Sequence, residues 1–125
     1  MFGKERNQAS AILGREGERR AENYLKAKGL KRLGRNFRCK TGEIDLVMQD
    51  TDGTVVFVEV KTRHSEDFTT AEQVVARAKQ QRLRRAARYF LASYPLAQDR
   101  PLRFDVVVVI AGDANEIRYY PSAFR

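Results

Sequence analysis

Four charged side chains on two consecutive predicted strands have the types and spacing that metal-dependent hydrolysis requires. Side chains alternate between the two faces of a strand. Glu43 and Asp45 therefore share one face of the first strand, and Glu59 and Lys61 share one face of the second. The alternating apolar positions are expected to face away from these charges; they are Ile44 and Leu46 on the first strand and Val56, Val58 and Val60 on the second.

The turn between the two strands predicts which residues face each other. Residues 51–53, Thr-Asp-Gly, fit a three-residue hairpin loop in which glycine takes a positive φ. That loop places Asp45 opposite Glu59 and Glu43 opposite Lys61, with Cβ atoms about 4.5–5.5 Å apart. A two- or four-residue loop would give a different alignment.

Two opposed carboxylates repel each other, so something must offset their charge. Mg²⁺ or Mn²⁺ is a natural candidate, because both ions prefer hard oxygen ligands. Lys61 would then orient an attacking water or neutralise a phosphate in the transition state, with Glu43 holding its ammonium in position. The alternative is a solvated hairpin face that carries an ordinary Glu43–Lys61 ion pair.

A third carboxylate is expected from the first helix, which the apolar spacing predicts over residues 9–28. Glu18 lies about 60° around this helix from the apolar Ala21, at the edge of the core-facing side. It is therefore the helical acid best placed to reach the sheet. The alternative is a salt bridge at the helix edge with Arg15 or Arg19.

The remaining elements predict an α/β fold of order α-β-β-β-α-β-β, in which helices flank a mixed sheet. A second helix is expected to begin at Thr69 or Thr70 and to end at Ser93, before Pro95. The five predicted strands cover residues 30–38, 41–49, 54–62, 102–111 and 116–120.

Length and composition favour one domain. The chain has 125 residues, 42% of them apolar, which suits a single core over residues 9–125 preceded by a mobile arm at 1–8.

One cysteine excludes an intramolecular disulfide. No apolar run is long enough to cross a membrane and no signal segment opens the chain, so we expect a cytoplasmic protein with no membrane partner.

The charge points to a polyanionic partner. Lys and Arg number 24 against 16 Asp and Glu, a net charge of +8, which favours nucleic acid, although a merely soluble basic surface is the alternative. Residues 74–97 contain no acid, and the arginines expected to contact phosphates lie there and around the hairpin. They are Arg77, Arg84, Arg85 and Arg88 on the second helix, with Arg35, Arg38 and Arg63 before and after the hairpin.

Several motifs together resemble the YraN family, over most of residues 13–124. They are Gly14-X-X-Gly17-Glu18, residues 35–38 (Arg-Asn-Phe-Arg), 42–46 (Gly-Glu-Ile-Asp-Leu), 57–63 (Phe-Val-Glu-Val-Lys-Thr-Arg), 103–105 (Arg-Phe-Asp) and 123–124 (Ala-Phe). Asp45 followed by Glu59-Val60-Lys61 is similar to the PD-(D/E)XK nuclease signature, with Ile44 in place of the proline. The resemblance implies a restriction-endonuclease-like core, similar to archaeal Holliday junction resolvases.

The resemblance also implies roles for individual residues. Asp45 and Glu59 would hold Mg²⁺ or Mn²⁺ with the Val60 carbonyl, and Lys61 would be the catalytic lysine. Glu18 matches the first-helix acid, Glu43 belongs to the family motif alone, and Gln73 lies where related nucleases use a polar residue. The expected function is endonuclease cleavage of nucleic acid, most naturally branched DNA in repair or recombination, by a protein that pairs as a homodimer.

Two other functions fit parts of the sequence. One is a non-catalytic nucleic-acid-binding module that keeps the nuclease fold. The other is a basic protein bound to ribosomal RNA, which explains the charge but leaves the opposed carboxylates unexplained. Cleavage that depends on a divalent metal separates the first function from both.

Overall fold

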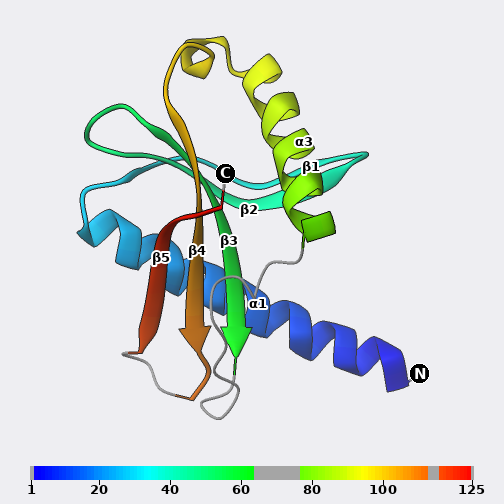
Figure 1. Cartoon of the computed structure of the whole chain (residues 1–125). Coiled ribbons are helices and arrows are strands. Elements are labelled where there is room, and N and C mark those ends of the chain that lie inside the picture. The colour runs from blue at the N-terminus through cyan, green and yellow to red at the C-terminus, as the bar shows by residue number, and fades with distance from the viewer. Residues whose placement is uncertain (1, 64–76, 113–115, 125) are drawn as a thin grey trace.

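The computed structural model describes residues 2–63, 77–112 and 116–124, with side chains from Gly14 onward. Figure 1 shows the elements in chain order. They are α1 (Phe2–Ala27), β1 (Lys31–Cys39), β2 (Gly42–Gln49), β3 (Val55–Arg63), α3 (Arg77–Ser93), the 3₁₀ helix η1 (Pro95–Ala97), β4 (Leu102–Ile110) and β5 (Ile117–Phe124).

The five strands form one mixed sheet in the order β1-β2-β3-β4-β5. β3 and β4 are parallel, whereas the other neighbouring pairs are antiparallel. The predicted α/β class and mixed sheet with flanking helices are confirmed. The element order differs by the short helix η1, and α1 begins at Phe2 rather than at Ala9. Gln73 and the predicted start of the second helix lie outside the described residues.

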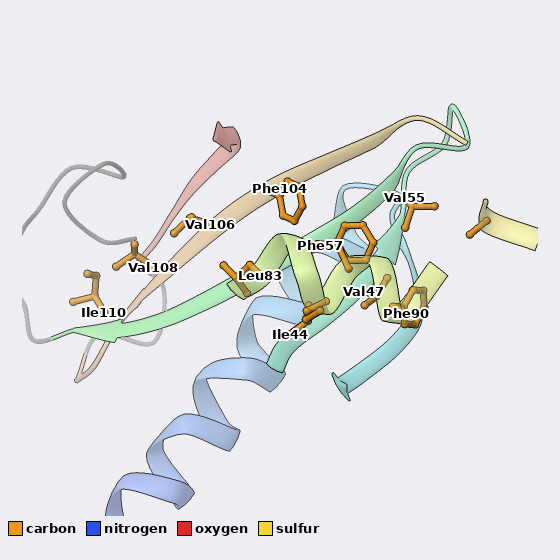
Figure 2. Close-up of a cluster of buried hydrophobic side chains, with 13 residues drawn as sticks. Ile44, Val47, Val55, Phe57, Leu83, Phe90, Phe104, Val106, Val108 and Ile110 are labelled. Carbon is orange, nitrogen blue, oxygen red and sulfur yellow. The ribbon is translucent and has the colours of Figure 1, made fainter. Parts of the chain in front are cut away.

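The two helices cover opposite faces of the sheet, because alternate strand residues pack against different helices. Leu83 and Phe90 of α3 pack against Phe57 and Ile44, and Figure 2 shows these side chains directed toward one another. On the other face Leu25 of α1 packs in a second cluster, and Figure 1 shows α1 passing behind the sheet. The second cluster contains Ala21, Leu30, Leu46, Met48, Val56, Val58, Val107 and Val109.

The predicted hairpin register is confirmed where β2 and β3 are paired. Gly53 has φ +90 and closes the loop, and the ladder runs from Gln49 opposite Val55 to Leu46 opposite Val58. Beyond Leu46 the two strands separate: β2 stays paired with β1 as far as Gly42, and β3 with β4 as far as Arg63.

The predicted alternation along the first strand of the hairpin is wrong at one step. Ile44 packs in the α3 cluster and Leu46 in the α1 cluster, so these two residues do not share a face. The change of face coincides with the point where β2 leaves β3, next to Asp45. On β3 the alternation holds, since Val56 and Val58 face α1 and Val60 packs against the same cluster.

A glycine permits the close approach of α1 to β3. Gly17 is buried, and a Cβ built on it would collide with Oγ1 of Thr62. Because no side chain intervenes, the helix backbone lies against the end of β3. This contact fixes the position of Glu18, the next residue of the helix, relative to Glu59 and Lys61.

Candidate active site

The candidate site lies where β2 and β3 separate. Asp45, only 8% exposed, points across the gap, and its Oδ2 accepts a hydrogen bond from the backbone N–H of Val60 at 2.8 Å. The carboxylate thus replaces the strand partner that β3 loses beyond Val58, satisfying a donor that would otherwise need another partner. This contact brings Asp45 beside Glu59, which precedes Val60 in the chain.

Glu59 is held by two lysines from different elements. Its side chain is 5% exposed, and Oε1 lies 2.9 Å from Nζ of Lys61 on β3 and 2.6 Å from Nζ of Lys79 on α3. Lys79 is not among the site residues predicted from the sequence. It is one of many basic residues on that helix, and only the packing of α3 on the sheet distinguishes it.

Asp45 and Glu59 line one pocket of about 300 Å³ between the sheet and α3. The walls combine two buried acids with cationic side chains from α3. The complete lining is Gly42, Glu43, Asp45, Glu59, Lys79, Arg82 and Leu83. The pocket therefore joins the residues expected to hold a metal to basic groups suited to a phosphate.

Burial and mutual repulsion alter the protonation of this site. Burial, followed by the neighbouring charge of Glu59, raises the pKa of Asp45 to about 7, although the Val60 N–H opposes the change. Burial also lowers the pKa of Lys61, and the nearby Lys79 lowers it further. An acid with so high a pKa is a candidate functional group, because binding a cation would favour its ionised form.

Glu18 lies within electrostatic range of these acids but lines a different pocket. Burial raises its pKa, and the charges of Glu43 and Glu59 add to the rise, while a hydrogen bond with Asn36 lowers it. Its pocket, of about 780 Å³, lies between α1 and β1. The structure therefore brings Glu18 near the site from the α1 side, with Asn36 as a partner that the sequence did not predict.

Glu43 does not hold Lys61 as predicted. Its side chain is about half exposed and pairs with Arg38 at 3.4 Å, whereas Lys61 pairs with Glu59. The separation of β2 from β3 explains this correction, because the direct Glu43–Lys61 pairing required the ladder to continue beyond Leu46. Glu43 still contributes to the pocket wall and to the electrostatic environment of Asp45.

Two of the buried acids offer a donor set for a divalent cation, Asp45 and Glu59. Within residues 2–63, 77–112 and 116–124, no three His, Cys, Asp or Glu side chains are arranged to hold a metal ion. The neighbouring carboxylates of Asp45 and Glu59 are nevertheless hard oxygen donors of the kind that Mg²⁺ and Mn²⁺ prefer. Mg²⁺ commonly binds through one or two protein carboxylates and retains several waters, so this pair is chemically suited to it.

The predicted phosphate-binding arginines divide into those that are exposed on α3 and those that already contact a neighbouring residue. Arg77, Arg85 and Arg88 belong to the first group. Arg84 belongs to the second, since its guanidinium lies over the Phe124 ring at 5.4 Å from the ring centroid. The others have local partners: Arg35 lies 3.7 Å from Glu22, Arg38 pairs with Glu43, and Arg63 donates to the Thr62 carbonyl.

Asp105 belongs to a separate polar network at the start of β4. Its fully buried carboxylate accepts hydrogen bonds from Arg103, from the Tyr119 hydroxyl and from the backbone N–H of Ser122. Arg103 also pairs with Asp50 at 2.7 Å, at the β2–β3 turn. This network ties β5 and the hairpin to β4, so its role is structural.

Comparison with known proteins gives one consistent result. The model of the "Uncharacterised protein family UPF0102" matches residues 17–109. A UPF0102 protein of Ralstonia nicotianae is 46% identical over 118 residues, covering 92% of this chain and 88% of the relative. A UPF0102 protein of Herminiimonas arsenicoxydans is 44% identical over 124 residues, which cover 99% of this chain and 95% of the relative. No helix in the described part of the chain is long and apolar enough to cross a membrane.

Proposed function

The chain belongs to the UPF0102 family, also called YraN, and we propose that it is a metal-dependent endonuclease of the PD-(D/E)XK type. Its substrate would be nucleic acid, most naturally branched DNA. The observation that carries the proposal is the burial of Asp45 and Glu59 in one pocket beside Lys61. Buried acids placed together cost stability, and a divalent cation would offset that cost.

The proposed cation is Mg²⁺ or Mn²⁺. Asp45 and Glu59 would hold it, with the Val60 carbonyl as a further oxygen. When bound, the cation would polarise the phosphodiester and lower the pKa of a water molecule. Glu18 would complete the negative environment from the α1 side, directly or through water.

The chain's own residues supply the remaining chemistry. The Lys61 ammonium lies beside Glu59, where it would stabilise the charge that develops on the phosphate. Asp45 and Glu59 are buried in a sheet that is covered by a helix on each face, so their carboxylates are held in place before substrate binds. Less rearrangement of these side chains is then needed during the reaction. Gln73 lies outside the described residues, and its proposed role as a further polar residue rests on the family resemblance alone.

Binding of the polyanion would use the exposed arginines of α3. Arg77, Arg85 and Arg88 form no ion pair with any described residue, so their charges are available to phosphates. Such contacts provide affinity without sequence specificity. The local partners of Arg35 and Arg38 would have to exchange for phosphate, which makes these two weaker contributors.

The direct test compares cleavage of a branched DNA and of a linear duplex of matched sequence, with Mg²⁺, Mn²⁺ or EDTA. We expect cleavage that requires metal and is abolished by Glu59→Gln. A matched control is Glu116→Gln, a carboxylate of similar type that pairs with Arg118 on β5. Equal cleavage by wild type and Glu59→Gln would contradict the proposal.

A second candidate function is a binding module without catalysis. It is favoured by the engagement of Glu59 with two lysines, which already neutralise its charge. The two functions differ in one respect: a module binds DNA with the same affinity in Mg²⁺ and in EDTA and leaves it intact.

A further inference from the structure

Lys79 makes a contact that simple ion pairing does not require. Its ammonium lies 2.6 Å from Oε1 of Glu59, and Lys61 already occupies the same oxygen at 2.9 Å. One carboxylate oxygen therefore has two cationic partners. Two ammonium groups so close together repel each other, so the arrangement has a cost that a pair with Lys61 alone would avoid.

The two lysines differ in their freedom to move. The Lys61 side chain is 17% exposed and belongs to the central strand β3, whereas that of Lys79 is 37% exposed and projects from α3. Lys79 also lines the pocket that Asp45 and Glu59 share. It can leave Glu59 by rotating into this pocket without any movement of the sheet.

A cation on Oε1 of Glu59 and the present position of Lys79 are mutually exclusive. Mg²⁺ binds carboxylate oxygens at about 2.0–2.1 Å, so an ion on Oε1 would lie almost against the ammonium group. The electrostatic repulsion between a dication and a lysine at that separation is large. An ion that bound this same oxygen would therefore have to displace Lys79.

We propose that Lys79 is a built-in counter-ion, which neutralises Glu59 in the metal-free protein and is released by metal to bind a substrate phosphate. The proposal rests on the proposed metal site and adds its regulation. Lys79 competes with the metal for Glu59, and the released ammonium faces the pocket beside Arg82. Metal loading and nucleic-acid binding are thereby coupled through one side chain.

The first test is a Mn²⁺ titration of the intact protein, followed by calorimetry. Lys79→Met removes a charge-assisted hydrogen bond that competes with the metal for Glu59, so it should raise Mn²⁺ affinity by roughly tenfold. Lys79→Arg keeps a cation there and should stay near wild type. Lys26→Met is the matched control, because it removes a lysine that lies 2.8 Å from another buried carboxylate, Glu22. Lys79→Gln replaces Lys79→Met if the latter does not fold.

The second test measures affinity for a DNA duplex with Ca²⁺, as a metal chosen to avoid cleavage, and with EDTA. Wild type should gain affinity with Ca²⁺, and Lys79→Met should lose most of that gain. Unchanged or weaker Mn²⁺ affinity in both Lys79→Met and Lys79→Gln would overturn the counter-ion role. If wild type itself binds no Mn²⁺, the proposed metal site fails, and this inference fails with it. If wild type binds Mn²⁺ but the Lys79 variants do not bind it more tightly, only the counter-ion role fails.

Discussion

The carboxylate of Asp45 accepts a hydrogen bond from the backbone N–H of Val60, at 2.8 Å, where β2 and β3 have stopped pairing. One side chain thus compensates for the separation of the strands and places its charge beside Glu59. The structural requirement and the candidate chemistry therefore involve the same carboxylate. Substitutions at Asp45 should consequently affect both stability and cation binding.

Without metal, Asp45 should make stability depend on pH. Its pKa is raised from 3.8 to about 7 in the folded protein, so the native state holds a proton that the unfolded state releases. The free energy of unfolding should therefore fall as pH rises from about 4 to about 7, by up to about 4 kcal/mol. Asp45→Asn keeps an acceptor for Val60 and should remove this dependence.

Urea denaturation in EDTA at pH 5 and pH 8 measures this effect. Asp45→Asn should be more stable than wild type at both pH values, and by a clearly larger margin at pH 8. Parallel pH profiles for the two proteins would show that the Asp45 carboxyl titrates normally.

Two glycines of α1 should respond in opposite ways to alanine. A methyl group on Gly14 would have no neighbour within 4 Å, so Gly14→Ala should stabilise the helix by about 0.5–1 kcal/mol. Gly17→Ala should instead destabilise the protein by about 1–3 kcal/mol, because the new methyl group meets Thr62. Thermal unfolding compares the variants, and Thr62→Ala should rescue Gly17→Ala. Equal effects of the two glycine substitutions would refute a close contact.

Exposed arginines of α3 should set the salt dependence of DNA binding. The double variant Arg85→Ala/Arg88→Ala removes two phosphate contacts, so the slope of log affinity against log salt should decrease by about 2. Fluorescence anisotropy over a range of KCl concentrations gives this slope. Lys26→Ala, on α1, is the control. An unaltered slope in the double variant would place the nucleic-acid surface elsewhere.

Asp105 should matter for stability and not for metal binding. Asp105→Ala leaves the partly buried Arg103 and Tyr119 without a shared acceptor, so it should lower the free energy of unfolding by about 3–5 kcal/mol. Mn²⁺ affinity, measured where the variant is folded, should equal that of wild type. A folded variant that had lost Mn²⁺ binding would make Asp105 part of the metal site.

Local patterns were sufficient to predict most of the fold. The loop Thr51-Asp52-Gly53 determined the β2–β3 register, because turn geometry and glycine conformation are properties of a few adjacent residues. The order of the predicted elements likewise indicated a mixed sheet flanked by helices, although α1 begins seven residues earlier than its apolar spacing predicted. The break in alternation between Ile44 and Leu46 was not predictable, since it depends on β2 leaving β3 to follow β1.

The candidate site was predictable only in part, for the same reason. Asp45, Glu59 and Lys61 lie on one hairpin, so strand spacing predicted that they gather. The predicted ladder pair of Asp45 with Glu59 is not formed, because pairing ends at Leu46 and Asp45 contacts the Val60 N–H instead. Lys79 reaches Glu59 through the packing of α3, and Asn36 reaches Glu18 between β1 and α1. Neither contact leaves a sequence signal, because each partner is distant in the chain and ordinary in type.

The proposed function depends on the binding of one divalent cation by Asp45 and Glu59 together. Crystals soaked in Mn²⁺ and measured at a wavelength with strong manganese anomalous scattering would reveal such an ion. We expect an anomalous peak within about 2.0–2.4 Å of an oxygen from each carboxylate, absent from Glu59→Gln crystals. A fully soaked wild-type crystal with no peak between these two side chains would show that they do not form a metal site.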